Sequence, residues 1–247
     1  MNEFVKGIIL RQMDYKESDT LLAVYTKEFG RLSFIAKGSK KPTSKNAAAL
    51  LPCTIAEISF DYKENKTLFP LKTARTIHLY RKMHENLSSY TIAEMMAEVV
   101  DILSGQLEEE HAYYDWLEKA FGYLEEGRDP YLVLSTFMAN ILLEVGVIPE
   151  VDACVNCGNV KVRAFGIHSG GFLCGSCAEL EHIEPWDKAE LAQMRLVIKG
   201  GLEEFEAIEK TGPISEKVAL TLVSFFESAF GVQIHAFLLY KRLFSVE

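Results

Sequence analysis

The first eighty residues place hydrophobic and polar side chains at the two-residue period of β-strands. Ile58, Phe60 and Tyr62 alternate with Ser59 and Asp61, which predicts a strand with one buried face. The other predicted strands are residues 4–10, 21–26, 31–36 and 68–73, with turns at 29–30 and 63–66. Five short strands with one longer loop predict a small barrel, for which an OB-fold is the economical choice and an SH3-like barrel the alternative.

From residue 77 onward, apolar residues follow the period of amphipathic helices. Asp129 and Pro130 predict a helix start, because aspartate caps helices and proline suits their first position. One long helix ending at Gly105 is predicted from a stripe consisting of Met83, Leu87, Tyr90, Met95, Val99 and Leu103. The other helices are predicted at 113–127, 129–146, 187–199, 202–210 and 215–230.

Two CxxC pairs, separated by sixteen residues, interrupt the helical pattern. They consist of Cys154, Cys157, Cys174 and Cys177. This spacing is typical of a zinc ribbon, because Zn²⁺ favours four thiolates in a tetrahedron and two short turns supply them without strain. Gly158 and Gly175 allow those turns to be tight. The sequence therefore predicts an α+β protein with an OB-fold domain at 1–80 and a helical domain at 81–247, with a structural zinc ribbon inserted at about 150–184.

Other readings of the cysteines have less support. Disulfides or a redox CxxC need a setting that this chain does not supply. A catalytic zinc would need an open coordination position and a general acid or base, for which His182 and Glu184 are the nearest candidates. Cys53 has apolar neighbours and is predicted to be a buried small hydrophobe.

The net charge of −9 is divided unevenly along the chain. Residues 1–82 hold 15 Lys and Arg against 8 Asp and Glu, a net charge of +7, whereas the remainder carries −16. A cationic domain attracts phosphates, while an acidic body repels them and leaves protein contacts open. The alternative is an ordinary solvated surface.

The predicted longer loop, residues 37–45, has the composition of a phosphate-binding segment. Its lysines are Lys37, Lys40, Lys41 and Lys45, and Arg31 and Lys16 could extend the track. Lysine binds phosphate without reading sequence, and the hydroxyls of Ser39, Thr43 and Ser44 could add contacts. A flexible loop whose lysines keep an edge soluble is the alternative. Some aromatic residues could stack on bases but are more typical of a core, namely Tyr15, Tyr25, Phe34, Phe60 and Tyr62.

Three segments, which together extend over nearly the whole chain, resemble those of one known family. They are the opening GIILRQMDYKESDTLLAVYTKEFGRLSFIAKGSKK, then LLEVGVIPEVDACVNCG followed by GGFLCGSC, and finally FFESAFGVQIHAFLLYKRLF. They are similar to the N-terminal OB domain, the helix with its zinc module and the closing helix of the bacterial recombination mediator family RecO. The order and spacing of the segments together make this resemblance quite specific.

The resemblance implies a DNA repair protein that acts by binding and is not an enzyme. Such proteins bind single- and double-stranded DNA, anneal complementary strands and, with RecR, load RecA onto single-stranded DNA coated by the single-stranded-DNA-binding protein (SSB). The acidic C-terminal tail of SSB would need a basic rim, for which Arg128, Lys241 and Arg242 are candidates. The zinc would be structural.

Two other classes of function stay open on the sequence alone. A scaffold could use its OB and zinc modules to bind only proteins. A hydrolytic or redox enzyme is disfavoured because the chain has no P-loop, GxSxG or HExxH motif. No apolar run approaches the length of a membrane span, and no signal peptide is visible, so we expect a cytoplasmic protein. The resemblance to the RecO family implies in addition that it is bacterial and associates with the nucleoid during repair.

Overall fold

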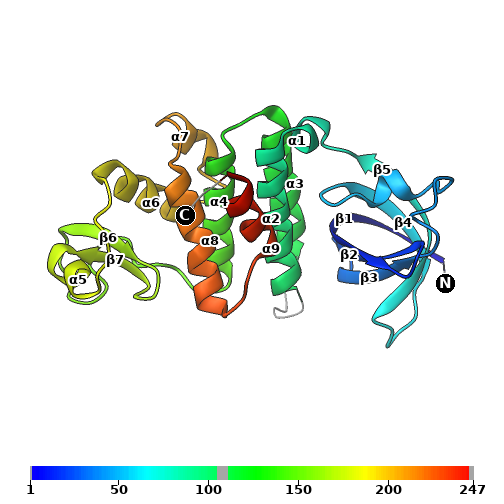
Figure 1. Cartoon of the computed structure of the whole chain (residues 1–247), viewed down its shortest axis with the longest axis horizontal. Helices are drawn as coiled ribbons and strands as arrows, with labels where there is room; N and C mark the ends of the chain where they lie inside the picture. The colour runs from blue at the N-terminus through cyan, green and yellow to red at the C-terminus, as the bar shows by residue number, and fades with distance from the viewer. Residues whose placement is uncertain (1, 105–110, 245–247) are drawn as a thin grey trace. The chain divides into compact units, whose positions relative to one another are not determined.

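The computed structural model describes residues 2–104 and 111–244. The chain forms two compact units. The first comprises Met1–Glu126 together with His235–Glu247, and the second comprises Gly127–Ile234 (Figure 1). The chain therefore leaves the first unit, builds the second and returns to the first.

Five strands at the start of the first unit close into a barrel with the order β1-β2-β3-β5-β4 (Figure 1). They are β1 (Asn2–Tyr15), β2 (Asp19–Thr26), β3 (Gly30–Ala36), β4 (Ile55–Asp61) and β5 (Leu68–His78). β3 pairs with β5 in parallel and the other neighbours are antiparallel. A short 3₁₀ helix, η1 (Ala47–Leu50), lies between β3 and β4. The barrel followed by helices confirms the predicted OB-fold architecture.

Alternate residues of each strand fill the interior of the barrel. Phe34, Phe60 and Phe69 are almost fully buried, and the ring centroids of Phe34 and Phe60 lie 5.1 Å apart. Tyr25 is also buried and its ring lies 6.1 Å from that of Tyr113 in the same unit. The buried position of Tyr25, Phe34 and Phe60 shows that they are core residues and do not stack on bases.

The predicted long helix is wrong, because Asn86 divides it into two helices. Asn86 has an extended backbone, and its side chain accepts a hydrogen bond from the backbone N–H of Ser89 at 3.0 Å, which starts a new helix. The two helices are α1 (Arg81–Glu85) and α2 (Leu87–Leu103). Leu87, expected on the buried stripe, is 54% exposed. Gly105, the predicted stop, lies outside the described residues.

Two further helices complete the first unit. α3 (His111–Glu126) follows α2, and α9 (His235–Phe244) packs against α2 although it is more than 100 residues away in the sequence (Figure 1). The Glu98 carboxylate of α2 accepts hydrogen bonds from the backbone N–H groups of His235 and Ala236, at 3.0 and 2.9 Å. A carboxylate at these free amide groups stabilises the start of α9.

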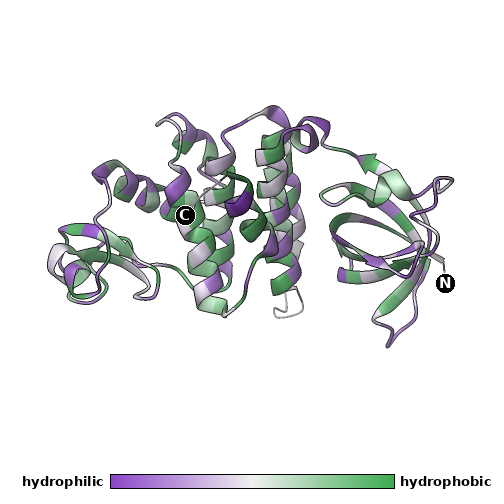
Figure 2. Ribbon diagram, viewed as in Figure 1, coloured by the Kyte–Doolittle hydropathy of each residue, from purple (hydrophilic) through white to green (hydrophobic). Residues whose placement is uncertain are grey.

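The second unit is a helical body that carries the cysteine module. Asp129 caps α4 (Pro130–Glu144) by accepting a hydrogen bond from the Tyr131 N–H at 3.0 Å, as predicted. α4 is apolar along most of its length and packs against α8 (Figure 2). The other elements of this unit are β6 (Val162–Gly166), β7 (Gly171–Cys174), α5 (Gly175–Leu180), α6 (Lys188–Gly200), α7 (Phe205–Glu209) and α8 (Glu216–Phe230). In the described parts of both units, no helix is long and apolar enough to cross a membrane.

Candidate nucleic-acid interface and metal centre

The lysine loop, residues 37–45, is held by hydrogen bonds to the start of β2. The Gly38 N–H donates to the Asp19 carboxylate at 2.8 Å, and the Ser39 hydroxyl lies 2.8 Å from that of Thr20. Gly38 has a φ of +64°, which glycine adopts without strain. Ser39 also donates to the Ala36 carbonyl at 3.0 Å and is only 5% exposed. Its hydroxyl is thus committed to the fold, and the expectation that it could contact phosphate is wrong.

The lysines of this loop differ in how their charges are used. Lys37, Lys41 and Lys45 are exposed, and none of them has an ion-pair partner within the described residues. Lys40 is also exposed, but its Nζ lies 2.7 Å from a carboxylate oxygen of Asp14. Three charges on a fixed loop are therefore available to a polyanion, and the fourth is partly neutralised.

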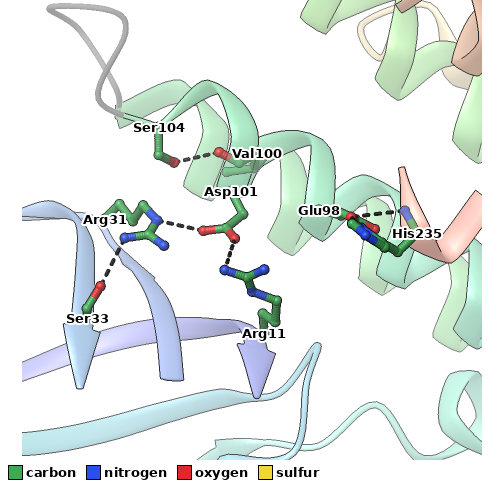
Figure 3. A network of polar contacts seen from close by, with 8 residues as sticks. All are labelled: Arg11, Arg31, Ser33, Glu98, Val100, Asp101, Ser104 and His235. Carbon is green, nitrogen blue, oxygen red and sulfur yellow. Dashed lines mark hydrogen bonds and ion pairs between the residues drawn. The ribbon is translucent and has the colours of Figure 1, made fainter. Parts of the chain in front are cut away.

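The two residues predicted to extend the lysine track have different surroundings. Lys16 is exposed in the turn between β1 and β2, with its Nζ 5.2 Å from the centroid of the Tyr15 ring. Arg31, on β3, is half-buried: its Nε donates to Asp101 Oδ1 at 2.6 Å and its Nη1 donates to the Ser33 hydroxyl at 3.0 Å (Figure 3). Arg31 therefore lies in an ion-pair network and not at the end of an open lysine track.

Arg11 joins the same network and was missed by the sequence analysis. Its Nη2 lies 3.4 Å from Asp101 Oδ2, so one carboxylate of α2 meets two barrel guanidinium groups (Figure 3). A β-bulge between Ile9 and Arg11 changes the side-chain alternation of β1 at this point. A bulge leaves no mark in the hydrophobic pattern, so the contact between Arg11 and Asp101 could not be predicted from the sequence.

Most other cations of the barrel are neutralised by nearby acids. The pairs are Lys6 with Glu118, Lys27 with Asp115, Lys72 with Asp61 and Arg75 with Glu57, at 2.7 to 3.3 Å. Exposed pairs of this kind add little stability, but they reduce the local positive potential. The excess positive charge of the first domain is thus concentrated in the exposed turns and loops, above all in the lysine loop.

The four cysteines of the two CxxC pairs form one cluster in the second unit. Their Sγ atoms lie within 4.8 Å of one another, and those of Cys157 and Cys174 are 3.6 Å apart. Four thiolates around Zn²⁺ at about 2.3 Å are separated by about 3.8 Å, so the cluster has the size of a tetrahedral zinc site. These cysteines could therefore hold a metal ion.

Local hydrogen bonds close the first CxxC turn and divide the four thiols into two with a lowered pKa, Cys154 and Cys174, and two with a raised pKa, Cys157 and Cys177. The Gly158 N–H donates to the Cys154 carbonyl at 2.8 Å and closes the first turn, where Gly158 has a φ of +74°. The Ser176 hydroxyl, followed by the Cys177 N–H, lowers the pKa of the Cys174 thiol to about 6. A metal binds thiolates, so a lowered pKa reduces the cost of deprotonation.

The catalytic-zinc alternative gains no support from the geometry of the described residues. Within the described chain, His182 and Glu184 do not belong to the group of atoms that could share a metal ion with the four thiols. Cys53 is fully buried, and burial raises the pKa of its thiol well above the usual value. The prediction that Cys53 is a core residue is confirmed.

Comparison with known proteins decides the family. The family model described as "Recombination protein O N terminal" matches residues 1–80, and the one described as "Recombination protein O C terminal" matches residues 84–234. The chain belongs to the RecO family. The resemblance inferred from its sequence segments is confirmed, and a role in DNA repair and recombination follows for this RecO protein.

Curated relatives agree over most of the chain. Proteins named DNA repair protein RecO from Lactobacillus delbrueckii subsp. bulgaricus and Exiguobacterium sibiricum are each 30% identical, over 69% and 70% of this chain and 68% and 70% of their own lengths. The relative of the same name from Bacillus mycoides is 25% identical over 94% of both chains. The likeness to RecO therefore includes both the barrel and the helical parts.

Proposed function

We propose that this protein is a recombination mediator that binds single- and double-stranded DNA, anneals complementary strands and, with RecR, helps to load RecA onto single-stranded DNA coated by SSB. The observation that supports DNA binding best is the lysine loop. Lys37, Lys41 and Lys45 are exposed without ion-pair partners in the described structure, on a loop that Asp19 holds in place. These are the features of a site that binds backbone phosphates.

Annealing follows from charge neutralisation and needs no catalytic group. Two complementary strands repel each other through their phosphates, and a cationic surface that binds both lowers this repulsion until base pairing holds them. Lysine contacts do not read sequence, so any complementary pair is a substrate. On this proposal the protein is not an enzyme.

The zinc ion would be held by Cys154, Cys157, Cys174 and Cys177 and would stabilise the fold without taking part in a reaction. Four thiolates fill a tetrahedron and leave no position for a substrate. Cys154 and Cys174 belong to a small cluster of buried residues with Ala164, Leu173 and Ala178, so a metal bound there would add to the stability of this module. DNA binding by the barrel is then independent of the metal.

Protein partners would meet the helical parts of the molecule. Of the three candidates for the acidic SSB tail, Arg128 is already ion-paired with Glu206 and Glu209. Lys241 lies over the ring of Phe237, with its Nζ 4.1 Å from the ring centroid, and Arg242 is in the same last turn of α9. Lys241 and Arg242 are thus better placed than Arg128 to bind a carboxylate.

The test is fluorescence anisotropy of the whole protein with a labelled unstructured oligonucleotide across a salt series, followed by addition of the complementary strand. Binding that weakens as salt rises, together with faster annealing than in protein-free buffer, would support the proposal. No binding at low salt would reject it in favour of a scaffold that contacts only proteins. Salt-independent binding would reject the phosphate-contact mechanism.

A further inference from the structure

A groove on the barrel combines two guanidinium groups with the exposed apolar surface of Met13 and Leu68. It has a volume of about 260 Å³ and lies where the β1, β2 and β3 surface meets the start of β5. Its lining includes Arg11, Arg31, Ser33, Met13, Leu21 and Leu68. Cavities that enclose a whole small molecule are usually about 300–1,000 Å³, so this groove suits part of a longer chain lying across it.

The charges in this groove are held by a single carboxylate. Asp101 Oδ1 lies 2.6 Å from Arg31 Nε, and Asp101 Oδ2 lies 3.4 Å from Arg11 Nη2 (Figure 3). The Asp101 side chain is 9% exposed, whereas those of Arg31 and Arg11 are 29% and 48% exposed. One negative charge faces two positive charges, so the groove keeps a net charge of +1 and two partly solvated guanidinium groups.

Asp101 is also poorly placed on its own helix. It lies in the last turn of α2, which ends at Leu103, where the helix dipole disfavours a negative charge. The two arginines offset this local repulsion. An external anion that binds both guanidinium groups would replace the carboxylate, and Asp101 would turn to water. Asp101 and an external anion would thus compete for the same two guanidinium groups.

We propose that this groove is a phosphate-binding site for single-stranded DNA and that Asp101 binds its two arginines until a strand displaces the carboxylate. The site rests on the proposed function, because it assigns a second contact to the same substrate. Guanidinium forks bind phosphate and carboxylate oxygens in the same way, so Asp101 stands where a phosphodiester would bind. Asp101 would then compete with the phosphates of DNA for Arg11 and Arg31.

The exposed apolar surface of Met13 and Leu68 would favour single-stranded over double-stranded DNA. Met13 and Leu68 are each 42% exposed beside the two arginines. An unpaired base presents an apolar face that can cover such side chains, whereas the bases of a duplex are stacked on each other. A single strand bound through its phosphates at Arg11 and Arg31 can pack a base against Met13 and Leu68, whereas the bases of duplex DNA are not available for this contact.

The decisive variant is Asp101→Asn, which keeps the shape and one of the two hydrogen-bond acceptors but removes the charge. In the wild type a strand must break both ion pairs of Asp101 before the arginines can meet phosphates, and the variant removes this cost. Single-strand affinity should therefore rise by up to about 30-fold while the salt slope stays close to that of the wild type, as measured by anisotropy with labelled oligothymidine. Duplex binding should change much less.

The matched control is Asp152→Asn in the second unit. Asp152 also contacts two cations, Lys199 at 2.7 Å and Arg195 at 3.8 Å, so the control changes the total charge equally. It should leave binding unchanged. Replacing Arg11 and Arg31 by alanine in the Asp101→Asn background should abolish the gain, and thermal melting verifies that each variant is folded.

The results separate this inference from the proposed function. If the folded Asp101→Asn variant binds oligothymidine no more tightly than Asp152→Asn, while neutralising the lysine loop still weakens binding, the groove is not a DNA site although the mediator proposal stands. A gain that survives removal of both arginines also overturns the inference. If the wild-type protein does not bind DNA at any salt concentration, both fail together.

Discussion

Neutralising the lysine loop should reduce DNA affinity by an amount that can be calculated. The variant replaces Lys37, Lys41 and Lys45 by glutamine, which removes three exposed charges that have no ion-pair partner in the described chain. Each contact with a single-strand phosphate contributes about 0.7 to the log–log salt slope, so the slope should fall by about 2. Relative to 1 M salt, this is a loss of about 500-fold at 50 mM and about 30-fold at 0.2 M.

The assay is anisotropy of a labelled oligothymidine titrated with each protein from 50 mM to 0.5 M salt. A matched control replaces Lys161, Lys188 and Lys210, which are exposed lysines of the second unit, by glutamine. Lys40→Gln alone should weaken binding only a few-fold, because Asp14 already shares its charge. If the loop variant keeps the wild-type slope, or if the control loses as much as the loop variant, the loop is not the contact surface.

Further predictions concern the zinc site and the core. Purified protein should contain one zinc per chain by elemental analysis, and Cys154→Ser with Cys174→Ser should lose it and lower the melting temperature while the salt slope of DNA binding stays unchanged. Phe34→Ala should lower the free energy of unfolding by about 3–5 kcal/mol in urea titrations, because it empties a fully buried site, whereas Phe29→Ala at a 41% exposed position should cost under about 1 kcal/mol. Burial raises the pKa of Glu94, so the folded protein favours the protonated acid and loses stability as pH rises through the carboxyl range. Glu94→Gln should therefore melt at a higher temperature than the wild type at pH 7, and this difference should shrink toward pH 4.

The sequence predicted those parts of the fold that depend on local pattern. Alternation located the barrel strands, and the cap at Asp129 located the start of α4, because both signals lie within a few residues of the structure that they predict. The break at Asn86 was missed because the apolar stripe continues across it. The stripe records which face is buried and does not show that the backbone changes direction.

For the candidate site, too, local contacts could be predicted from the sequence and long-range contacts could not. The spacing of the cysteines predicted that Cys154 and Cys174 would meet, because two CxxC turns leave few alternatives. The pairing of Arg31 with Asp101 could not be predicted, since 69 residues separate the two and their contact depends on how α2 packs on the barrel. Charge counts identified a cationic domain but could not show which of its cations are already neutralised.

The return of α9 to the first unit affects the way this chain folds during its synthesis. The 108 residues of Gly127–Ile234 are translated between α3 and α9, which takes about 5–20 s at ordinary ribosomal rates. During this interval the barrel and its first helices exist on the ribosome, but the face of α2 that α9 covers is open and Glu98 has no helix to cap. A chain interrupted after the second unit would keep this face exposed as a target for chaperones and proteases. The contact between α2 and α9 thus distinguishes a finished molecule from a nascent or truncated one.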